Sequence, residues 1–275
     1  MFEPAKRKRI VKSSRKFCGG RLEERTVSEL LNYHRYLFQW HCRKFFRFRR
    51  YLSEAEKAYL EVCFSLAKEF REVSDSGYEH FSYYSYSHRV HGDKVNSSRL
   101  AYGSVAHPQP ALEAARPVLR ERSLALDAYF LESPHSKFYG LGWDILEEQF
   151  KVYFRVQPVQ LLPDNLKHLL QDYDLEDHRD EGLVSFTYTR NQLSESKIYL
   201  YPKSSLNLPA GAQGQASMVS DQRGLVTQYD LSQPEQWAQR LSGPGRRILE
   251  LYRELDEELD TIQYQDEENY TLYFP

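Results

Sequence analysis

The apolar positions of this chain switch several times between a helical period and a period of two. Over residues 26–51 leucine and phenylalanine recur at roughly helical spacing, and Ser53 with Glu56 fits a capping box that opens a second helix. After Gly77 the alternating segments FSYYSYSH and SSRLAYGS flank the turn-forming sequence HGD. The pattern therefore predicts two helices followed by a β-hairpin.

Further hairpins follow, with helical segments between them. The hairpins are expected in KFYGLGWDI with QFKVYFRV, GLVSFTYTR with SKIYLYP, SMVSDQRGLVTQYDL, and DTIQYQDEENYTLYFP. Helices are expected over 111–131, 163–173 and 245–259. Hairpins give antiparallel pairing, whereas parallel strands need a crossover between them. We therefore expect an α+β fold in which about ten strands close an antiparallel β-barrel surrounded by α-helices.

The central strands carry two different faces. In FKVYFRV the Phe and Val residues share one face, while Lys151, Tyr153 and Arg155 share the other. In SKIYLYP the residues Lys197 and Tyr199 likewise face away from Ile and Leu. A sheet with one solvated face alternates in the same way, because Lys, Arg and Tyr are common on exposed strands. Since two strands repeat Lys-x-Tyr, we favour a barrel interior lined for an anionic ligand.

Composition narrows the class of protein. A net charge of -2 gives no global basic field, so non-specific binding to nucleic acid is not expected. No stretch approaches the roughly 18 apolar residues of a membrane span, and the basic N-terminus lacks the apolar run of a secretory signal, so we expect a cytoplasmic protein without a membrane span. Cys18, Cys42 and Cys63 have no disulfide or zinc spacing. Residues 1–25 are expected to form a basic arm, and 26–275 a single domain.

Several segments resemble a known family. GLGWDILEEQFKVYF (140–154), SFTYTRNQLSESKIYLYP (185–202) and IQYQDEENYTLYF (262–274) resemble successive hairpins of the dimethylallyltryptophan synthase family of indole prenyltransferases. YEHFSYYSY and SSRLAY are similar to the segments that supply the family's base and a diphosphate-binding Arg. The resemblance covers about residues 75–275. It implies the ABBA barrel, which is built from repeated α-β-β-α units.

The resemblance also implies an activity. Such a protein transfers an allylic prenyl group, here expected to be dimethylallyl, from its diphosphate to an indole or tryptophan-type acceptor by electrophilic aromatic substitution. It requires no cofactor, and Mg²⁺ is at most stimulatory. The leaving diphosphate needs cations, and the carbocation needs aromatic faces that exclude water. The implied roles are catalytic base for Glu79; diphosphate binding for Arg99, Lys151, Lys197 and Arg155; cation shield for Tyr153, Tyr199, Tyr201, Tyr229 and Tyr273; and acceptor binding for Tyr188 and Gln263.

The sequence departs from the family pattern in its length, which is short for the family, and in the spacing from Glu79 to Arg99, which is wider than in the family. Three further features also differ. Glu195 stands two residues before the second Lys-x-Tyr, where many members have Arg. In TQYDL the residues Gln228 and Tyr229 are adjacent rather than alternating. Tyr270 and Tyr273 are three positions apart, so they face opposite sides of one strand and only one can line the barrel.

Other functions remain open at this point. The acceptor could be a phenol, or a Tyr or Trp side chain of a peptide. A noncatalytic protein with the same sheet could bind an anionic or aromatic ligand, or RNA through basic and stacking residues. A metal site is not expected, because QDYDLEDHRDE (171–181) lacks a strict Asp-Asp-x-x-Asp and reads as a solvated acidic turn, and because His88 and His91 lack metal spacing.

Overall fold

The structure is a computed structural model of the chain. The residues that it describes are 51–68, 82–104, 107–170, 178–202, 213–221, 224–232, 241, 243–254, 259 and 261–274. The expected basic arm at 1–25, the first expected helix and Glu79 all lie outside the described residues.

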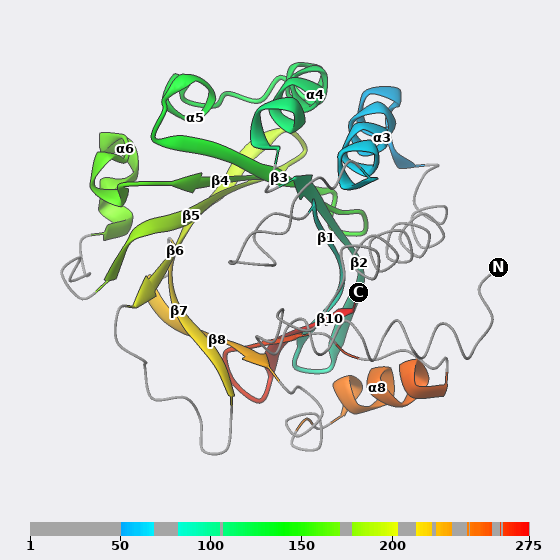
Figure 1. The fold of residues 1–275 in the computed structure, drawn as a ribbon. Coiled ribbons are helices and arrows are strands. Elements are labelled where there is room, and N and C mark those ends of the chain that lie inside the picture. The colour runs from blue at the N-terminus through cyan, green and yellow to red at the C-terminus, as the bar shows by residue number, and fades with distance from the viewer. Residues whose placement is uncertain are drawn as a thin grey trace, which may run out of the picture.

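Ten antiparallel strands form one sheet, which curls until its first and last strands pair (Figure 1). Each strand pairs with its neighbours along the chain, and the pairing of β1 with β10 closes the barrel. The strands are β1 (Ser82–His91), β2 (Lys94–Ser104), β3 (Ser136–Asp144), β4 (Gln149–Val156), β5 (His178–Thr189), β6 (Gln192–Pro202), β7 (Gln213–Asp221), β8 (Gly224–Ser232), β9 (Thr261–Tyr264) and β10 (Asn269–Phe274). The expected α+β fold, an antiparallel sheet curled into a barrel with helices around it, is confirmed.

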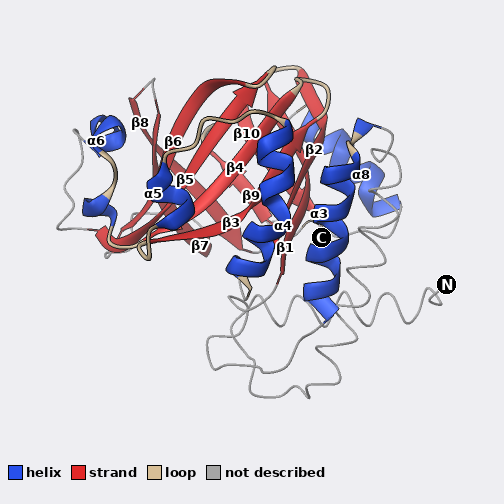
Figure 2. Cartoon of the chain, turned by 90° about the horizontal axis from the view of Figure 1, so that it is seen from above, coloured by secondary structure: helices blue, strands red, loops and turns tan. Residues whose placement is uncertain are grey.

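Helices lie outside this ring of strands (Figures 1 and 2). They are α3 (Glu54–Lys68), α4 (Pro108–Glu121), α5 (Ala128–Glu132), α6 (Asp164–Lys167) and α8 (Pro244–Glu254), with the 3₁₀ turns η3 (Val159–Leu161) and η4 (His168–Leu170) on either side of α6. Over the described part of the helix expected at 163–173, the chain forms one α-helical turn followed by a 3₁₀ turn that ends at Leu170. Over the described part of the helix expected at 245–259, the chain forms α8.

The single helix expected over 111–131 is wrong, because the chain forms two helices there. Backbone helical geometry ends after α4, where Ser123 adopts a left-handed φ of 52°. A new helix, α5, follows the N-cap residue Asp127, whose carboxylate accepts a hydrogen bond of 2.9 Å from the backbone N–H of Tyr129. An aspartate in this position is a favourable N-cap, so it starts a second helix with its own direction.

The main hydrophobic core lies between the outer face of the sheet and the helices. Phe130 of α5 contacts Phe154 of β4 and Phe186 of β5, with ring centroids 5.1 and 4.8 Å apart. Between α3 and the sheet, the ring of Tyr59 packs against the ring of Trp143 of β3, with ring centroids 6.2 Å apart. Because side chains alternate along a strand, the residues between these aromatic positions face into the barrel.

A buried carboxylate ties the helices to the sheet. Glu56, only 2% exposed, forms the expected capping box with Ser53, since its Oε2 accepts from the Ser53 N–H at 2.8 Å. Its other oxygen accepts from Arg122, just past the end of α4, at 2.5 Å and from the Trp143 indole N–H at 2.8 Å. The charge is therefore paired and hydrogen-bonded, as a buried carboxylate must be.

Candidate functional site

Strand β4 presents a polar face to the interior of the barrel. Its Phe154 contacts Phe130 in a helix outside the ring, so alternation turns Lys151, Tyr153 and Arg155 inward. Burial follows the same alternation, because the outward residues are fully buried under the helices and the inward ones are partly exposed.

Strand β6 repeats this arrangement one strand further round the barrel. Ile198 and Leu200 are fully buried, whereas Lys197, Tyr199 and Tyr201 are partly exposed on the opposite face. Only β5 separates β4 from β6. The two Lys-x-Tyr repeats therefore line neighbouring parts of one inner wall.

Arg99, Lys151 and Lys197 form a group that we call the cation patch. The pKa of Lys151 is lowered to about 7, first by burial and then by the positive charges of Arg99, Lys197 and Arg89, while Glu195 acts in the opposite direction. Glu195 also lies 3.1 Å from the Lys197 ammonium. Positive charge is thus crowded on this wall, and one carboxylate offsets part of it.

Arg99 is held from two sides. Its Nε lies 3.8 Å from Asp144 Oδ2, and its Nη1 donates to Thr271 Oγ1 at 3.5 Å. The Asp144 carboxylate accepts two further hydrogen bonds, both of 2.8 Å, from the side-chain amide of Asn96. Asp144 is 6% exposed, so it serves to fix the guanidinium, and the Arg99 side chain keeps 17% of its surface exposed.

Tyrosines surround the cation patch. Burial alone would lower the pKa of Arg99, but its neighbours raise it above the usual value; they are Tyr273, Tyr153, Asp144 and Tyr199. The three phenols therefore lie close to the guanidinium. Tyr273 also donates a hydrogen bond of 2.8 Å to Gln263 Oε1, which fixes the ring on the inner wall. Phenol faces beside cations can stabilise a carbocation and exclude water from it.

Small residues leave room between these side chains. Gly142 and Ala101 occupy the inward positions of β3 and β2 opposite Lys151. A Cβ atom at Gly142 would lie 3.2 Å from the ring of Tyr153, so glycine allows that ring to lie over the backbone. A cavity of about 20 Å³ remains here, lined by Arg99, Lys151, Tyr153 and Tyr273 among others, and it fits about one water molecule or phosphate oxygen.

Hydroxyl groups on the inner wall have unused hydrogen-bonding capacity. Ser185 pairs with Lys197 in the sheet register, and Thr187 pairs with Lys151. The side-chain oxygens of Ser185, Thr187 and Ser217 are buried, and within the described part of the chain they have no hydrogen-bond partner. An unsatisfied buried hydroxyl costs about 1–3 kcal/mol, so these groups suit a ligand with several acceptor oxygens.

Two residues expected at the site lie on the other face of the sheet. Tyr188 is 2% exposed and donates to the Ala125 carbonyl at 3.4 Å, and burial raises its pKa to about 12. Tyr229 pairs with Tyr264, which pairs with Tyr270, and the Tyr270 hydroxyl lies against α8 outside the barrel. The positions therefore do not fit acceptor binding by Tyr188 or cation shielding by Tyr229. Of the two closing tyrosines, Tyr273 faces inward.

The remaining expected residues are dispersed. Arg155 faces inward, but its guanidinium lies 5.9 Å from the ring centroid of Tyr139, two positions beyond Tyr153. Tyr201 lies two positions beyond Tyr199 on the inner face. Sequence reasoning did not single out Asp144, Asn96 or the buried hydroxyls. Asp144 was visible at the end of GLGWD, but its proximity to Arg99 depends on the β2–β3 register.

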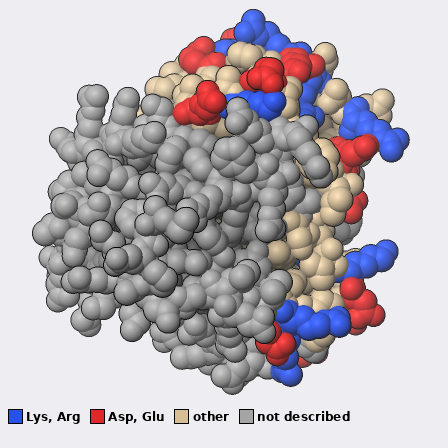
Figure 3. Space-filling model, turned by 90° about the vertical axis from the view of Figure 1, so that its right-hand side faces the viewer, with Lys and Arg blue, Asp and Glu red and all other residues tan. Residues whose placement is uncertain are grey.

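The outer surface has a different charge pattern from the inner wall. Figure 3 shows Lys and Arg interspersed with Asp and Glu over the described part of one face. Within the described ranges, no helix is long and apolar enough to cross a membrane. Groups of three or more His, Cys, Asp or Glu that could hold a metal do not occur among the same residues.

The fold and the site together define a closed antiparallel barrel whose inner wall combines a cation patch with tyrosines. A scan against models of protein families finds no match for this chain, and a search of curated proteins finds none either.

Proposed function

We propose that this protein is an ABBA-type aromatic prenyltransferase that moves a dimethylallyl group from its diphosphate to an indole or tryptophan-type acceptor. The observation that carries the proposal is the meeting of Arg99, Lys151 and Lys197 with Tyr153, Tyr199 and Tyr273 on one inner wall. The order of the elements, hairpins with helices between most of them, agrees with α-β-β-α units.

The reaction uses both halves of this arrangement. The C–O bond of the allylic diphosphate breaks, and its electron pair leaves with the diphosphate, whose charge the cation patch stabilises. Buried hydroxyls such as those of Ser185 and Thr187 can donate to the same anion. The tyrosine faces shield the allylic cation until the acceptor ring attacks it. The side chains of Arg99, Lys151 and Lys197 are positioned beforehand, and Lys151 takes up a proton when the diphosphate binds, so a bound metal is not required.

A base must finally take a proton from the alkylated ring. The described carboxylates nearest the cation patch are both engaged, Asp144 with Arg99 and Glu195 with Lys197. Glu79 therefore remains the proposed base.

The test is an incubation with dimethylallyl and geranyl diphosphates and a panel of indoles and phenols, with EDTA, followed by mass spectrometry. We expect a prenylated aromatic product that is formed without metal. Lys151→Ala and Lys197→Ala should weaken diphosphate binding, whereas Lys167→Ala, at an exposed ion pair with Asp164 on α6, should not. Binding without product for any acceptor would instead indicate a noncatalytic anion-binding protein.

A further inference from the structure

A β-bulge in β6 turns a carboxylate toward the cation patch. Tyr188 of β5 pairs with Leu193 of β6. The preceding residue of β5, Thr187, pairs with Glu195, so Ser194 is an extra residue in β6. Without the bulge, alternation would place Glu195 on the outer face of the sheet together with Leu193. The bulge therefore gives β6 an inward carboxylate beside the inward lysine of its Lys-x-Tyr repeat.

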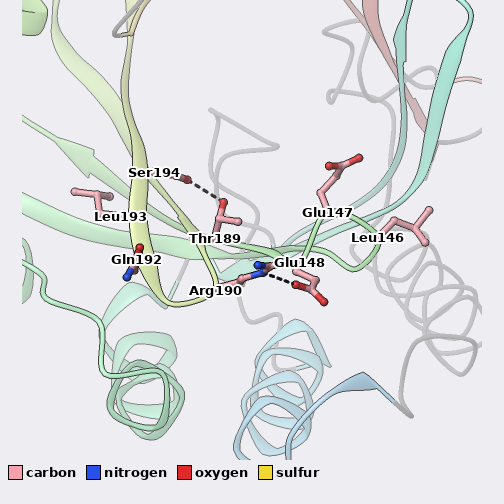
Figure 4. A pocket seen from close by; sticks show the side chains of 8 residues that line it. All are labelled: Leu146, Glu147, Glu148, Thr189, Arg190, Gln192, Leu193 and Ser194. Atoms are coloured by element: carbon pink, nitrogen blue, oxygen red, sulfur yellow. Dashed lines mark hydrogen bonds and ion pairs between the residues drawn. The ribbon is translucent and has the colours of Figure 1, made fainter.

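Side-chain hydrogen bonds hold this bulge in place. The hydroxyl of Ser194 donates to the Thr187 carbonyl at 3.0 Å, and it accepts a hydrogen bond of 3.1 Å from the Thr189 hydroxyl (Figure 4). Bulges are over-represented next to functional sites, where they re-aim a side chain. The inward position of Glu195 is thus fixed by the local structure of the hairpin.

Glu195 is a built-in counterion for part of the cation patch. Its Oε2 lies 3.1 Å from the Lys197 ammonium, and its charge acts to raise the pKa of Lys151. It leaves the strand between the two lysines unsatisfied, because the hydroxyls of Ser185 and Thr187 are buried and have no hydrogen-bond partner among the described residues. These donors remain for an anion that is larger than one carboxylate.

A diphosphate that contacts both lysines competes with this carboxylate. Two anionic groups next to one ammonium repel each other, so binding of a phosphate group to Lys197 requires Glu195 to turn away. The Glu195 side chain is 26% exposed, so it has solvent to turn into. When the diphosphate leaves, the carboxylate can return to Lys197, and this contact stabilises the protein after release.

We propose, on the basis of the proposed function, that Glu195 sets the release of the diphosphate product by competing with it for Lys197. The carboxylate turns away when dimethylallyl diphosphate binds and returns when pyrophosphate leaves. The cation patch therefore binds diphosphate less tightly than its three cationic side chains would alone, which prevents the product from occupying the site for long.

The first test measures anion binding without any prenyl acceptor. Isothermal titration calorimetry compares inorganic pyrophosphate with inorganic phosphate at pH 6, where Lys151 is mostly protonated. We expect Glu195→Gln to lower the Kd for pyrophosphate about fivefold and the Kd for phosphate about twofold, because phosphate carries about half the charge. The matched control is Glu148→Gln, at an exposed ion pair with Arg190 on the hairpin tips (Figure 4), and it should bind both anions as the wild type does.

A double-mutant cycle tests whether the effect passes through Lys197. Glu195→Gln is compared with the wild type and again in a Lys197→Met background. The gain in pyrophosphate affinity should fall below about twofold when the lysine is absent. A gain that persists in full would overturn the competition, because it would then come from the general repulsion between carboxylate and anion. Glu195→Asp, whose shorter side chain withdraws the carboxylate from Lys197, is the second variant and should show a smaller gain than Glu195→Gln.

The outcomes separate this inference from the function on which it rests. In an active enzyme, the inhibition constant of pyrophosphate against dimethylallyl diphosphate should fall about fivefold in Glu195→Gln. Turnover with an unchanged pyrophosphate Kd in this variant would overturn the inference and leave the prenyltransferase intact. Tighter pyrophosphate binding in the variant without a product from any acceptor would overturn the transferase and keep the competition at Lys197. Absence of pyrophosphate binding in every protein would overturn both.

Discussion

Lys151 makes diphosphate binding depend on pH in a way that the structure allows us to calculate. Its pKa is about 7, so about nine-tenths of this side chain is protonated at pH 6 and about one-tenth at pH 8. A bound diphosphate favours the protonated form. We therefore expect the contribution of Lys151 to make affinity for dimethylallyl diphosphate fall about tenfold between pH 6 and pH 8, and about one proton to be taken up on binding at pH 8.

The measurement is isothermal titration calorimetry at both pH values, in two buffers with different ionisation enthalpies. The diphosphate itself loses a proton in this range, which must be separated from the effect of the lysine. Lys151→Arg is the control, because a guanidinium stays protonated at both pH values. The predicted quantity is the ratio of the wild-type affinity to the Lys151→Arg affinity, and this ratio should fall about tenfold from pH 6 to pH 8. The same pH dependence in both proteins would refute the titration of Lys151 between pH 6 and pH 8.

Four other substitutions test separate parts of the structure. Lys151→Met should raise the free energy of unfolding at pH 7 by roughly 1–2 kcal/mol while weakening diphosphate binding. Lys151 is protonated in the unfolded chain but mostly neutral in the folded protein between about pH 7 and pH 10.5, so the free energy of unfolding should rise with pH across this window. Denaturant titrations at several pH values should find that the variant loses part of this rise. Glu56→Ala should lower the free energy of unfolding, measured by thermal unfolding, by roughly 3 kcal/mol, because Arg122 and Trp143 lose their buried partner. The control is Glu54→Ala, which removes an exposed ion pair with Lys57 and should change the free energy of unfolding by less than about 0.5 kcal/mol. Gly142→Val should displace Tyr153 and reduce turnover more than about tenfold while circular dichroism and diphosphate binding persist; wild-type turnover would mean that the ring does not shield the cation. Glu79→Gln should reduce turnover at least about a hundredfold with unchanged diphosphate affinity, and a fully active variant would assign the base to another residue.

Alternation along the central strands carried most of the structural information in this sequence. The Phe and Val residues of FKVYFRV had to share a face, so the inward position of Lys151 and Tyr153 followed once the apolar face was packed against helices. The same argument holds for Lys197 and Tyr199. The same alternation applies to SFTYT, where Tyr188 lies on the same face as the apolar Phe186. This position indicated, from the sequence alone, that Tyr188 would not face the acceptor inside the barrel.

Contacts between distant strands did not follow from the sequence. The pairing of Tyr229 with Tyr264 depends on how β8 registers with β9, and the meeting of Arg99 with Asp144 depends on β2 and β3. A shift of one residue in either register would reverse the faces. The break between α4 and α5 was also missed, because the helical spacing of apolar residues outweighed the capping signal of Asp127.

The two faces of the sheet have opposite effects on stability, and this links the fold to the site. Crowding Lys151 beside Arg99 and Lys197 destabilises the folded chain, as does each buried hydroxyl without a partner. The outward face offsets these costs, since contacts such as those between Phe130, Phe154 and Phe186 each contribute about 0.5–1.5 kcal/mol beyond the burial of their surface. A wall held rigid from outside can keep the Lys151 amine close to the Arg99 and Lys197 cations before any anion binds, and groups positioned in advance are what an ionising diphosphate requires.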